Sequence, residues 1–293
     1  MASSSNHKAA GSSTEVFLVS GEMVLTRAFI VGCPRSGTTL VQKLLGARQD
    51  TYTLRETHFF QNIRRPGPAK LLDYWRLSKT QVDLAYAFIS RNNDLQVEHD
   101  PRNVRSLPQA VHFLDQLMSA EASARGRVAW VEKTPAHLYF VRWIERYLPS
   151  AHIVHVLRDG RDVVASLIDV ADRFPQAKAW RYSQDVSAAI GTYNRYLRAS
   201  LKCRGRSNHV FIRYEHIIED VDREKKRLFN LLDLADQESS ATLKDLHHSV
   251  VREDEVWKED FGNQIRDTRL AKFNRLFDDE QKQWIISRLV EIP

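Results

Sequence analysis

Two segments of this chain repeat one pattern: a short apolar run, a loop that holds an arginine and a glycine, and then an amphipathic stretch. The first apolar run spans residues 28–32 (AFIVG), and the second spans residues 152–157 (HIVHVL). Short apolar runs that end at turn-forming residues are typical of buried strands, whereas apolar positions three or four residues apart are typical of helices. The sequence therefore predicts two strand–loop–helix units.

The rest of the chain adds alternating strand and helix signals. Further strands are predicted at residues 51–54, 128–131 and 210–214. Helices are predicted from apolar periodicity at residues 38–45, 135–148, 182–201 and 226–234. Thr134 and Pro135 fit the N-cap and the first position of the second of these helices. Such alternation predicts an α/β fold, a P-loop-like three-layer sandwich with a central, mainly parallel sheet flanked by helices, whose ligands bind beyond the carboxyl ends of the strands.

One sizeable core is expected, because 43% of the 293 residues are hydrophobic. We expect a disordered tail over residues 1–24, which begin rich in serine and lack a signal-peptide pattern, and then a single domain over residues 25–293. The stretch 64–125 is polar at its start and carries a helical pattern at 82–89. We interpret it as a helical insertion, which serves either as a cap over a site or as a plain surface excursion.

The net charge of +6 and the pI near 9.3 suit an anionic ligand. The lysines and arginines are scattered, and the dense cluster at 223–227 falls in a helical pattern, where a solvated face is its ordinary role. We therefore expect no nucleic-acid or membrane partner. Two cysteines cannot build a disulfide framework and no apolar run is long enough to span a bilayer, so we expect a cytoplasmic location. The sequence does not decide between a monomer and a homodimer.

A glycine loop joins the first strand to its helix. Gly32 and Gly37 are separated by four residues and followed by Thr38 and Thr39, which gives the pattern G-x-x-x-x-G-T-T. The backbone N–H groups of such a loop converge with a helix N-terminus on a phosphate. A nucleotide triphosphatase has a lysine directly after the second glycine, where this chain has Thr38. The loop therefore suits a phosphate better than a metal-bound triphosphate, and we expect no metal site.

Two motifs carry a resemblance to a known family: residues 33–45 (CPRSGTTLVQKLL) and residues 152–166 (HIVHVLRDGRDVVAS). The first resembles the loop with which sulfotransferases bind the 5′-phosphosulfate of 3′-phosphoadenosine 5′-phosphosulfate (PAPS), and the second resembles their 3′-phosphate motif. The arginine in the first loop is similar to that of the branch that includes protein-tyrosine sulfotransferases and bacterial small-molecule sulfotransferases. The likeness covers residues 28–60 and 128–216 and is weak over 262–285.

The resemblance implies PAPS as the sulfuryl donor and 3′-phosphoadenosine 5′-phosphate (PAP) as its product. It assigns the 5′ end of the nucleotide to Arg35, Ser36, Gly37, Thr38 and Thr39. It assigns the 3′-phosphate side to Arg158, Ser166 and Tyr214, and a covering cation near the C-terminus to Lys272. Arg158 ends a predicted strand and Ser166 lies eight residues later, about two turns into the next helix, so both can approach one phosphate there.

Three further residues are candidates for handling the acceptor and the transferred group. By resemblance, Glu56 matches a glutamate that takes the acceptor's proton, and His58 is the rival base because an unperturbed histidine titrates near neutral pH. In an extended segment these two side chains point to the same side, so one would be the base and the other would orient it. Lys133 ends a predicted strand and matches a lysine that neutralises the transferring group. With Arg35 they form the predicted catalytic set.

We expect direct in-line transfer of the sulfuryl group to a hydroxyl or an amine of a small-molecule acceptor, whose identity the sequence does not give. Two other functions remain open. A P-loop nucleotide or small-molecule kinase would share the sheet and the loop but would need Mg²⁺, whereas a sulfotransferase runs in EDTA. A non-catalytic polyanion-binding module would bind in a strongly salt-sensitive way and would tolerate Arg35→Ala.

Overall fold

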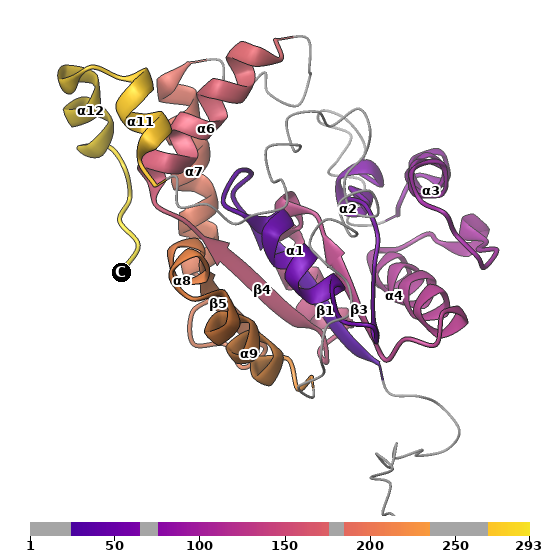
Figure 1. Cartoon of the computed structure of the whole chain (residues 1–293). Helices are drawn as coiled ribbons and strands as arrows, with labels where there is room; N and C mark the ends of the chain where they lie inside the picture. Colours follow the sequence, from indigo (N-terminus) through magenta and orange to yellow (C-terminus); the bar gives the residue numbers. More distant parts are fainter. Residues whose placement is uncertain (1–24, 65–75, 176–184, 235–268) are drawn as a thin grey trace, which may run out of the picture.

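The computed structural model of the chain describes residues 25–64, 76–175, 185–234 and 269–293. In these ranges one parallel sheet forms, with strand order β2-β3-β1-β4-β5 (Figure 1). The strands are β1 (Thr26–Gly32), β2 (Thr51–Thr53), β3 (Ala129–Lys133), β4 (His152–Leu157) and β5 (His209–Arg213). The predicted α/β fold with a central parallel sheet is confirmed.

Helices cover both faces of the sheet (Figure 1). In the first half of the chain the described helices are α1 (Thr38–Gly46), α2 (Phe59–Asn62), α3 (Lys79–Asn92), η2 (Pro101–Asn103), α4 (Leu107–Ala124), η3 (Pro135–Phe140) and α5 (Val141–Tyr147). In the second half they are α6 (Gly160–Arg173), α7 (Val186–Leu201), α8 (Tyr214–Glu219), α9 (Val221–Leu231), α11 (Ala271–Leu276) and α12 (Asp279–Ile286). None of these helices combines the length and the hydropathy needed to cross a membrane.

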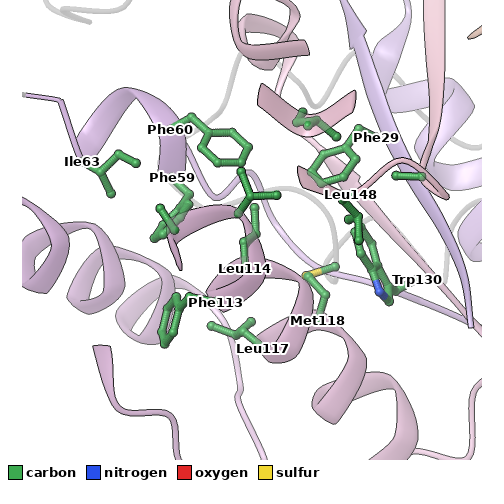
Figure 2. Packing of buried hydrophobic residues seen from close by; sticks show 14 of the residues in the cluster. Phe29, Phe59, Phe60, Ile63, Phe113, Leu114, Leu117, Met118, Trp130 and Leu148 are labelled. Atoms are coloured by element: carbon green, nitrogen blue, oxygen red, sulfur yellow. The ribbon is translucent and has the colours of Figure 1, made fainter. Parts of the chain in front are cut away.

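Alternate residues of β1 point to opposite faces of the sheet and so define the three layers. Ala28 and Ile30 pack in one buried cluster with residues of α1 and α9. Phe29 and Val31 face the other way, in a cluster with residues of α4 and α5. Figure 2 shows the second cluster, in which the ring of Phe29 meets Trp130 edge-on with centroids 5.2 Å apart. Burial of these large rings drives the packing of the helices on this face.

Several predicted elements have different bounds in the structure. The helix predicted at 135–148 is divided into η3 and α5. Thr134 and Pro135 hold the predicted N-cap and first positions, but the Thr134 hydroxyl makes no cap bond, because it donates to Glu132 at 2.6 Å and accepts from the N–H of His58. The strand predicted at 128–131 runs on to Lys133, which pairs in register with Ile30. The helix predicted at 226–234 begins earlier, at Val221, because the Asp220 side chain caps it. Residues 182–184 of the predicted helix at 182–201 lie outside the described ranges.

The described part of the stretch 64–125 holds α3, η2 and α4, and the last of these helices belongs to the core. Leu114, Leu117 and Met118 of α4 are fully buried in the cluster that Figure 2 shows. Part of the stretch therefore forms one layer of the fold, which is a role beyond that of a cap or a surface excursion. Residues 1–24 and 65–75 lie outside the described ranges, so the predicted tail and the single-domain boundary stay predictions.

Candidate active site

One predicted site residue lies at or just beyond the carboxyl end of each strand. Because the strands are parallel, these ends meet at a single edge of the sheet. In spatial order from β2 to β5 the edge carries Glu56, Lys133, Arg35, Arg158 and Tyr214. The sheet thus brings together residues from five separate parts of the sequence, and this edge is the candidate active site.

The loop between β1 and α1 has the backbone of a phosphate cradle. Gly37 precedes α1 with φ at 99°, and a Cβ atom there would lie 2.4 Å from Cδ2 of Tyr214, so only glycine fits. Arg35 also has a positive φ, 71°, which costs a non-glycine residue about 1–2 kcal/mol. Thr38 and Thr39 form the first turn of α1, which no side chain caps. Such an uncapped helix start directs its first N–H groups at an anion.

The second predicted turn packs directly against this loop. The guanidinium of Arg158 lies over the ring of Tyr214, 4.0 Å from its centroid, and its Nη1 donates to the carbonyl oxygen of Arg35 at 3.3 Å. Arg35 Nε in turn donates to Ser166 Oγ on α6 at 3.1 Å. Asp159 caps α6 through the N–H of Arg161. The structure therefore joins Arg35, Arg158, Ser166 and Tyr214 in one network of contacts, in which Asp162 lies 3.5 Å from Arg158 Nη2.

Several buried polar atoms near these contacts have no hydrogen-bond partner among the described residues, and one of them is Asp162 Oδ2, beside Arg158. Two others are the donors Ser36 Oγ and Arg158 Nε, whose side chains are less than a tenth exposed. A buried donor left unsatisfied costs about 1–3 kcal/mol. A phosphate oxygen would satisfy both atoms, so the donor set fits the nucleotide phosphates that the sequence predicts.

Lys272 lies on α11, beside the second turn but not in it. Its Nζ is 2.6 Å from Asp169, one turn beyond Ser166 on α6, and Arg275 binds the same carboxylate at 2.9 Å. The N–H of Leu270 donates to Asp162 at 2.8 Å, near the start of α6. These contacts fasten α11 to the helix that follows the second phosphate turn. The structure thus brings Lys272 near the predicted 3′-phosphate side through α6, and contact with a nucleotide stays a prediction.

Glu56, His58 and Lys133 come together on the other half of the edge. Lys133 Nζ forms an ion pair with Glu56, and the two side chains are 0% and 9% exposed. His58 Nε2 is 3.3 Å from the second Glu56 oxygen, and its ring is partly exposed. The segment is not extended as predicted, because His58 has φ at 47° and stands at the N-cap of α2. The two side chains still meet, since Glu56 lies between Lys133 and His58.

A second buried carboxylate contacts the residues next to Glu56 and Lys133 in the sequence, and the sequence analysis did not select it. Glu132 is fully buried and accepts hydrogen bonds from Thr57 Oγ1 at 2.8 Å and Thr134 Oγ1 at 2.6 Å. Its other oxygen lies 2.8 Å from His137 Nδ1. Burial alone would raise the pKa of Glu132, but His137, Thr134 and Thr57 outweigh it and hold the pKa below its usual value. The only sequence signal was a glutamate inside a strand predicted to be buried.

Cys33, in the phosphate loop, is buried. Burial raises the pKa of its thiol well above the usual value, which disfavours the nucleophilic thiolate. Tyr196 lines a cavity together with Cys33 and Ser36 of the phosphate loop and Arg158 of the second turn.

Comparisons of sequence give a consistent family. A profile described as the sulfotransferase family matches residues 27–238, more than half of the chain. An uncharacterised protein of Aquifex aeolicus (strain VF5) is 30% identical over 138 residues, covering 47% of this chain and 16% of that protein. The nodulation protein NoeE of Sinorhizobium fredii (strain NBRC 101917 / NGR234) is 25% identical over 214 residues, covering 68% and 48%. A putative protein-tyrosine sulfotransferase of Caenorhabditis briggsae is 24% identical over 226 residues, covering 76% and 69%. The match thus spans less than half the length of the first two relatives.

Solved structures share the fold. The sulfotransferase domain from the curacin biosynthetic pathway has a TM-score of 0.58 at 14% identity, covering 93% of this chain and 100% of that one. The sulfotransferase domain of the Synechococcus PCC 7002 olefin synthase has a TM-score of 0.56 at 15% identity, covering 96% and 100%. Mouse sulfotransferase SULT7A1, complexed with PAP, has a TM-score of 0.51 at 10% identity, covering 89% and 82%. Because the family profile also includes both phosphate motifs, this chain belongs to the sulfotransferase family.

Proposed function

We propose that the protein transfers the sulfuryl group of PAPS to a hydroxyl or an amine of a small-molecule acceptor in the cytoplasm. The observation that carries this proposal is the pair of joined phosphate turns with unsatisfied buried donors, beside a buried carboxylate–lysine pair on the same sheet edge. Family membership supports sulfuryl transfer as the reaction. The PAP complex of the mouse structural neighbour supports the choice of nucleotide.

The first turn holds the 5′ end of the nucleotide in this proposal. Backbone N–H groups from Gly37 to Thr39, at the start of α1, face the 5′-phosphate, and the Ser36 hydroxyl gains a partner that it lacks among the described residues. Arg35 supplies positive charge to the leaving phosphate, where negative charge grows in the transition state. PAPS, when bound, supplies a sulfuryl group that is activated by its phosphate leaving group.

The second turn holds the 3′-phosphate. Arg158 offers a guanidinium fork whose plane is fixed by the ring of Tyr214, and its Nε gains a partner. Ser166 adds a hydroxyl from α6, where it already contacts Arg35. Lys272 contributes positive charge from α11, one helical turn farther along α6.

Glu56 is the general base in this proposal, and His58 orients it. The buried ion pair with Lys133 holds the Glu56 carboxylate in place to accept the acceptor's proton. His58 contacts the second carboxylate oxygen from the more exposed side, where an acceptor would enter. Lys133 stands between the base and the phosphate loop, since β3 lies beside β1 in the sheet, and it neutralises charge on the transferring group.

Calorimetry with PAP, followed by a transfer assay with PAPS and a panel of acceptors, tests the proposal. We expect saturable 1:1 binding of PAP that Arg35→Ala weakens at least tenfold. Arg91→Ala, an exposed arginine on α3, is the matched control and should bind as the wild type does. No saturation by PAP with the folded wild-type protein would refute the nucleotide assignment.

The metal requirement separates the sulfotransferase from the kinase alternative. Transfer from PAPS should proceed at the same initial rate with EDTA as with added Mg²⁺, because no step needs a metal-bound phosphate. A rate that depends on Mg²⁺ and on a nucleoside triphosphate would favour the kinase. Salt-sensitive binding that survives both Arg35→Ala and Arg158→Ala would favour a polyanion-binding module.

A further inference from the structure

A cluster of buried side chains with metal-binding atoms lies outside the proposed active site. His155 comes from the middle of β4, His209 from the start of β5, and Cys203 from the turn after α7. One potential ligand atom from each of the three lies within 4.8 Å of the other two. The transfer reaction proposed above uses none of them, so their convergence needs a separate explanation.

The two histidines already have nearly the spacing of ligands to one ion. His155 Nε2 and His209 Nδ1 are 2.8 Å apart. Two nitrogens that each bind a tetrahedral Zn²⁺ at about 2.0–2.1 Å lie about 3.3 Å from each other. A small rotation of either ring opens that separation, and the thiol of Cys203 completes a three-ligand set. Cys203 Sγ donates a hydrogen bond to the carbonyl oxygen of Ala199 at 3.6 Å, which is the bond that the structure gives it.

A carboxylate fixes the orientation of one of these rings. Glu145 on α5 lies 3.0 Å from His209 Nε2, and two bonds from Arg206, at 2.7 and 2.8 Å, hold it there. A histidine that donates its Nε2–H group to a carboxylate turns the lone pair of Nδ1 inward, towards His155. This arrangement, in which a carboxylate supports a ligating histidine, is the usual surrounding of zinc ligands in proteins.

The other ring is also fixed, and it has an unsatisfied atom. His155 is fully buried and stacks on Phe211 with an interplanar angle of 7° and centroids 4.5 Å apart. Its Nδ1 has no hydrogen-bond partner among the described residues. A mere hydrogen-bonded histidine pair would explain the contact between the rings, but it would explain neither the thiol beside them nor the supporting carboxylate. Two imidazoles and one thiolate favour Zn²⁺ over Mg²⁺ or Ca²⁺.

We propose that His155, Cys203 and His209 bind one Zn²⁺ ion, with a water molecule as the fourth ligand and Glu145 as the support of His209. On binding, the Cys203 thiol loses its proton to solvent and the proton on His155 Nε2 moves to Nδ1, with no change of oxidation state. The ion would fasten β4, β5 and the turn after α7 to one another. Arg158 and Tyr214 directly follow these two strands, so the ion would stiffen the support of the 3′-phosphate turn.

The sequence predicted no metal site, since the phosphate loop does not suit a metal-bound triphosphate and no pair of histidines within one segment indicates another site. His152 and His155 are three residues apart on one strand and so face opposite sides. The three donors instead come from neighbouring strands and the turn that joins α7 to β5. Parallel pairing places Ile153 beside His209 and His155 beside Phe211, and in this register the two histidine rings meet.

The test is zinc content and cobalt spectroscopy of the tag-free full chain, compared with Cys203→Ser and His209→Ala. We expect about one zinc per chain in the wild type by mass spectrometry and at least a tenfold loss in both variants. Replacement of zinc by Co²⁺ should give a thiolate-to-cobalt charge-transfer band that Cys203→Ser removes. His112→Ala, an exposed histidine on α4, is the matched control and should retain both signals.

Thermal unfolding gives a second measurement that does not depend on enzyme activity. After long dialysis against EDTA, addition of Zn²⁺ should raise the Tm of the wild type by roughly 5–10 °C. Cys203→Ser, a nearly isosteric change, should fold with a normal far-UV circular dichroism spectrum and show no such rise. Wild-type protein that binds neither Zn²⁺ nor Co²⁺, or Cys203→Ser protein that binds them equally well, would overturn the proposal. The proposed sulfuryl transfer would stand in either case.

Discussion

The two halves of the sheet edge differ in how their polar side chains are paired. On the donor side, which comprises the phosphate turns after β1 and β4, the donors Ser36 Oγ and Arg158 Nε have no hydrogen-bond partner among the described residues. On the acceptor side the carboxylates are paired: Glu132 contacts three side chains, and Glu56 contacts Lys133 and His58. His137 Nε2 is the atom of this network that lacks a partner in the described part of the chain. The donor side thus has hydrogen-bond donors available for an anionic ligand, whereas the carboxylates of the acceptor side are paired with side chains of the protein. Loss of a charge on the donor side should therefore weaken nucleotide binding. Loss of a charge on the acceptor side should lower both the rate of transfer and the stability of the fold.

The largest effect is expected from Glu56→Gln, which removes the proposed general base from the acceptor side. The amide has nearly the same shape but cannot take a proton, so kcat should fall by about 10²–10⁴-fold. PAP affinity should change by no more than a few fold, because the nucleotide turns are untouched. Steady-state kinetics and calorimetry on the same preparation measure the two quantities. Glu98→Gln, an exposed glutamate in the same half of the chain, should change neither.

A companion variant distinguishes the base from its orienting partner. Asparagine tolerates the positive φ of residue 58 better than alanine does, so His58→Asn is the cleaner change. We expect a smaller loss of kcat than in Glu56→Gln, since the carboxylate remains. If Glu56→Gln keeps the normal rate while His58→Asn abolishes it, the roles of the two residues are reversed.

The next effect is a loss of stability from Glu132→Gln, which shows how far the acceptor side depends on a buried charge. The substitution leaves the partners of Glu132 facing a neutral amide, and removal of one member of a buried charged group costs about 3 kcal/mol of unfolding free energy. Urea unfolding at neutral pH measures it. Glu219→Gln removes an exposed partner of Arg269 and should cost less than about 1 kcal/mol. Equal losses in the two variants would show that the buried network does not stabilise the fold.

The pH dependence of this stability has a definite sign. The folded-state pKa of Glu132 lies below its ordinary value of 4.5, so the unfolded chain takes up the proton first as the solution is acidified. The contribution of Glu132 is therefore complete above pH 4.5 and is lost as the pH falls towards the folded-state pKa. The difference in unfolding free energy between wild type and Glu132→Gln should stay constant from neutral pH to about pH 5 and shrink as the pH falls below about 4.5. A difference that stays constant below that pH as well would contradict the assigned ionised state.

A smaller effect, confined to binding, is expected on the donor side. Arg158→Ala should weaken PAP by about 10–100-fold, which matches the roughly 1.5–3 kcal/mol of a hydrogen bond to a charged group. Arg158→Lys should recover only part of this, because a lysine lacks the guanidinium fork. Arg161→Ala, in the same turn but bound to Asp159, is the matched control. Unchanged affinity in Arg158→Ala, measured by calorimetry, would remove this residue from the phosphate pocket.

The same contrast explains what could be predicted from the sequence. The donor side follows from local patterns: residues 28–32 and 152–157 are compact apolar runs, and each loop is contiguous with its helix. Glu56, His58 and Lys133 were found by resemblance, although the left-handed conformation of His58 was not. Glu132 escaped notice because its partners Thr57, Thr134 and His137 come from two segments, which only the pairing of β2 with β3 brings together. Long-range charge pairing leaves no local pattern.

The smallest effect is expected from Lys272→Ala, at the outer margin of the donor side. Its partner Asp169 keeps Arg275, and a partly exposed ion pair contributes at most about 1 kcal/mol, so Tm should fall by no more than about 3 °C. PAP affinity should fall by less than about threefold, and added salt should reduce the difference further. Lys282→Ala on α12 removes a comparable ion pair, with Asp279, away from the phosphate turns. A tenfold loss of PAP affinity in Lys272→Ala alone would show that Lys272 leaves Asp169 to bind the nucleotide directly, and the donor side would then extend to α11.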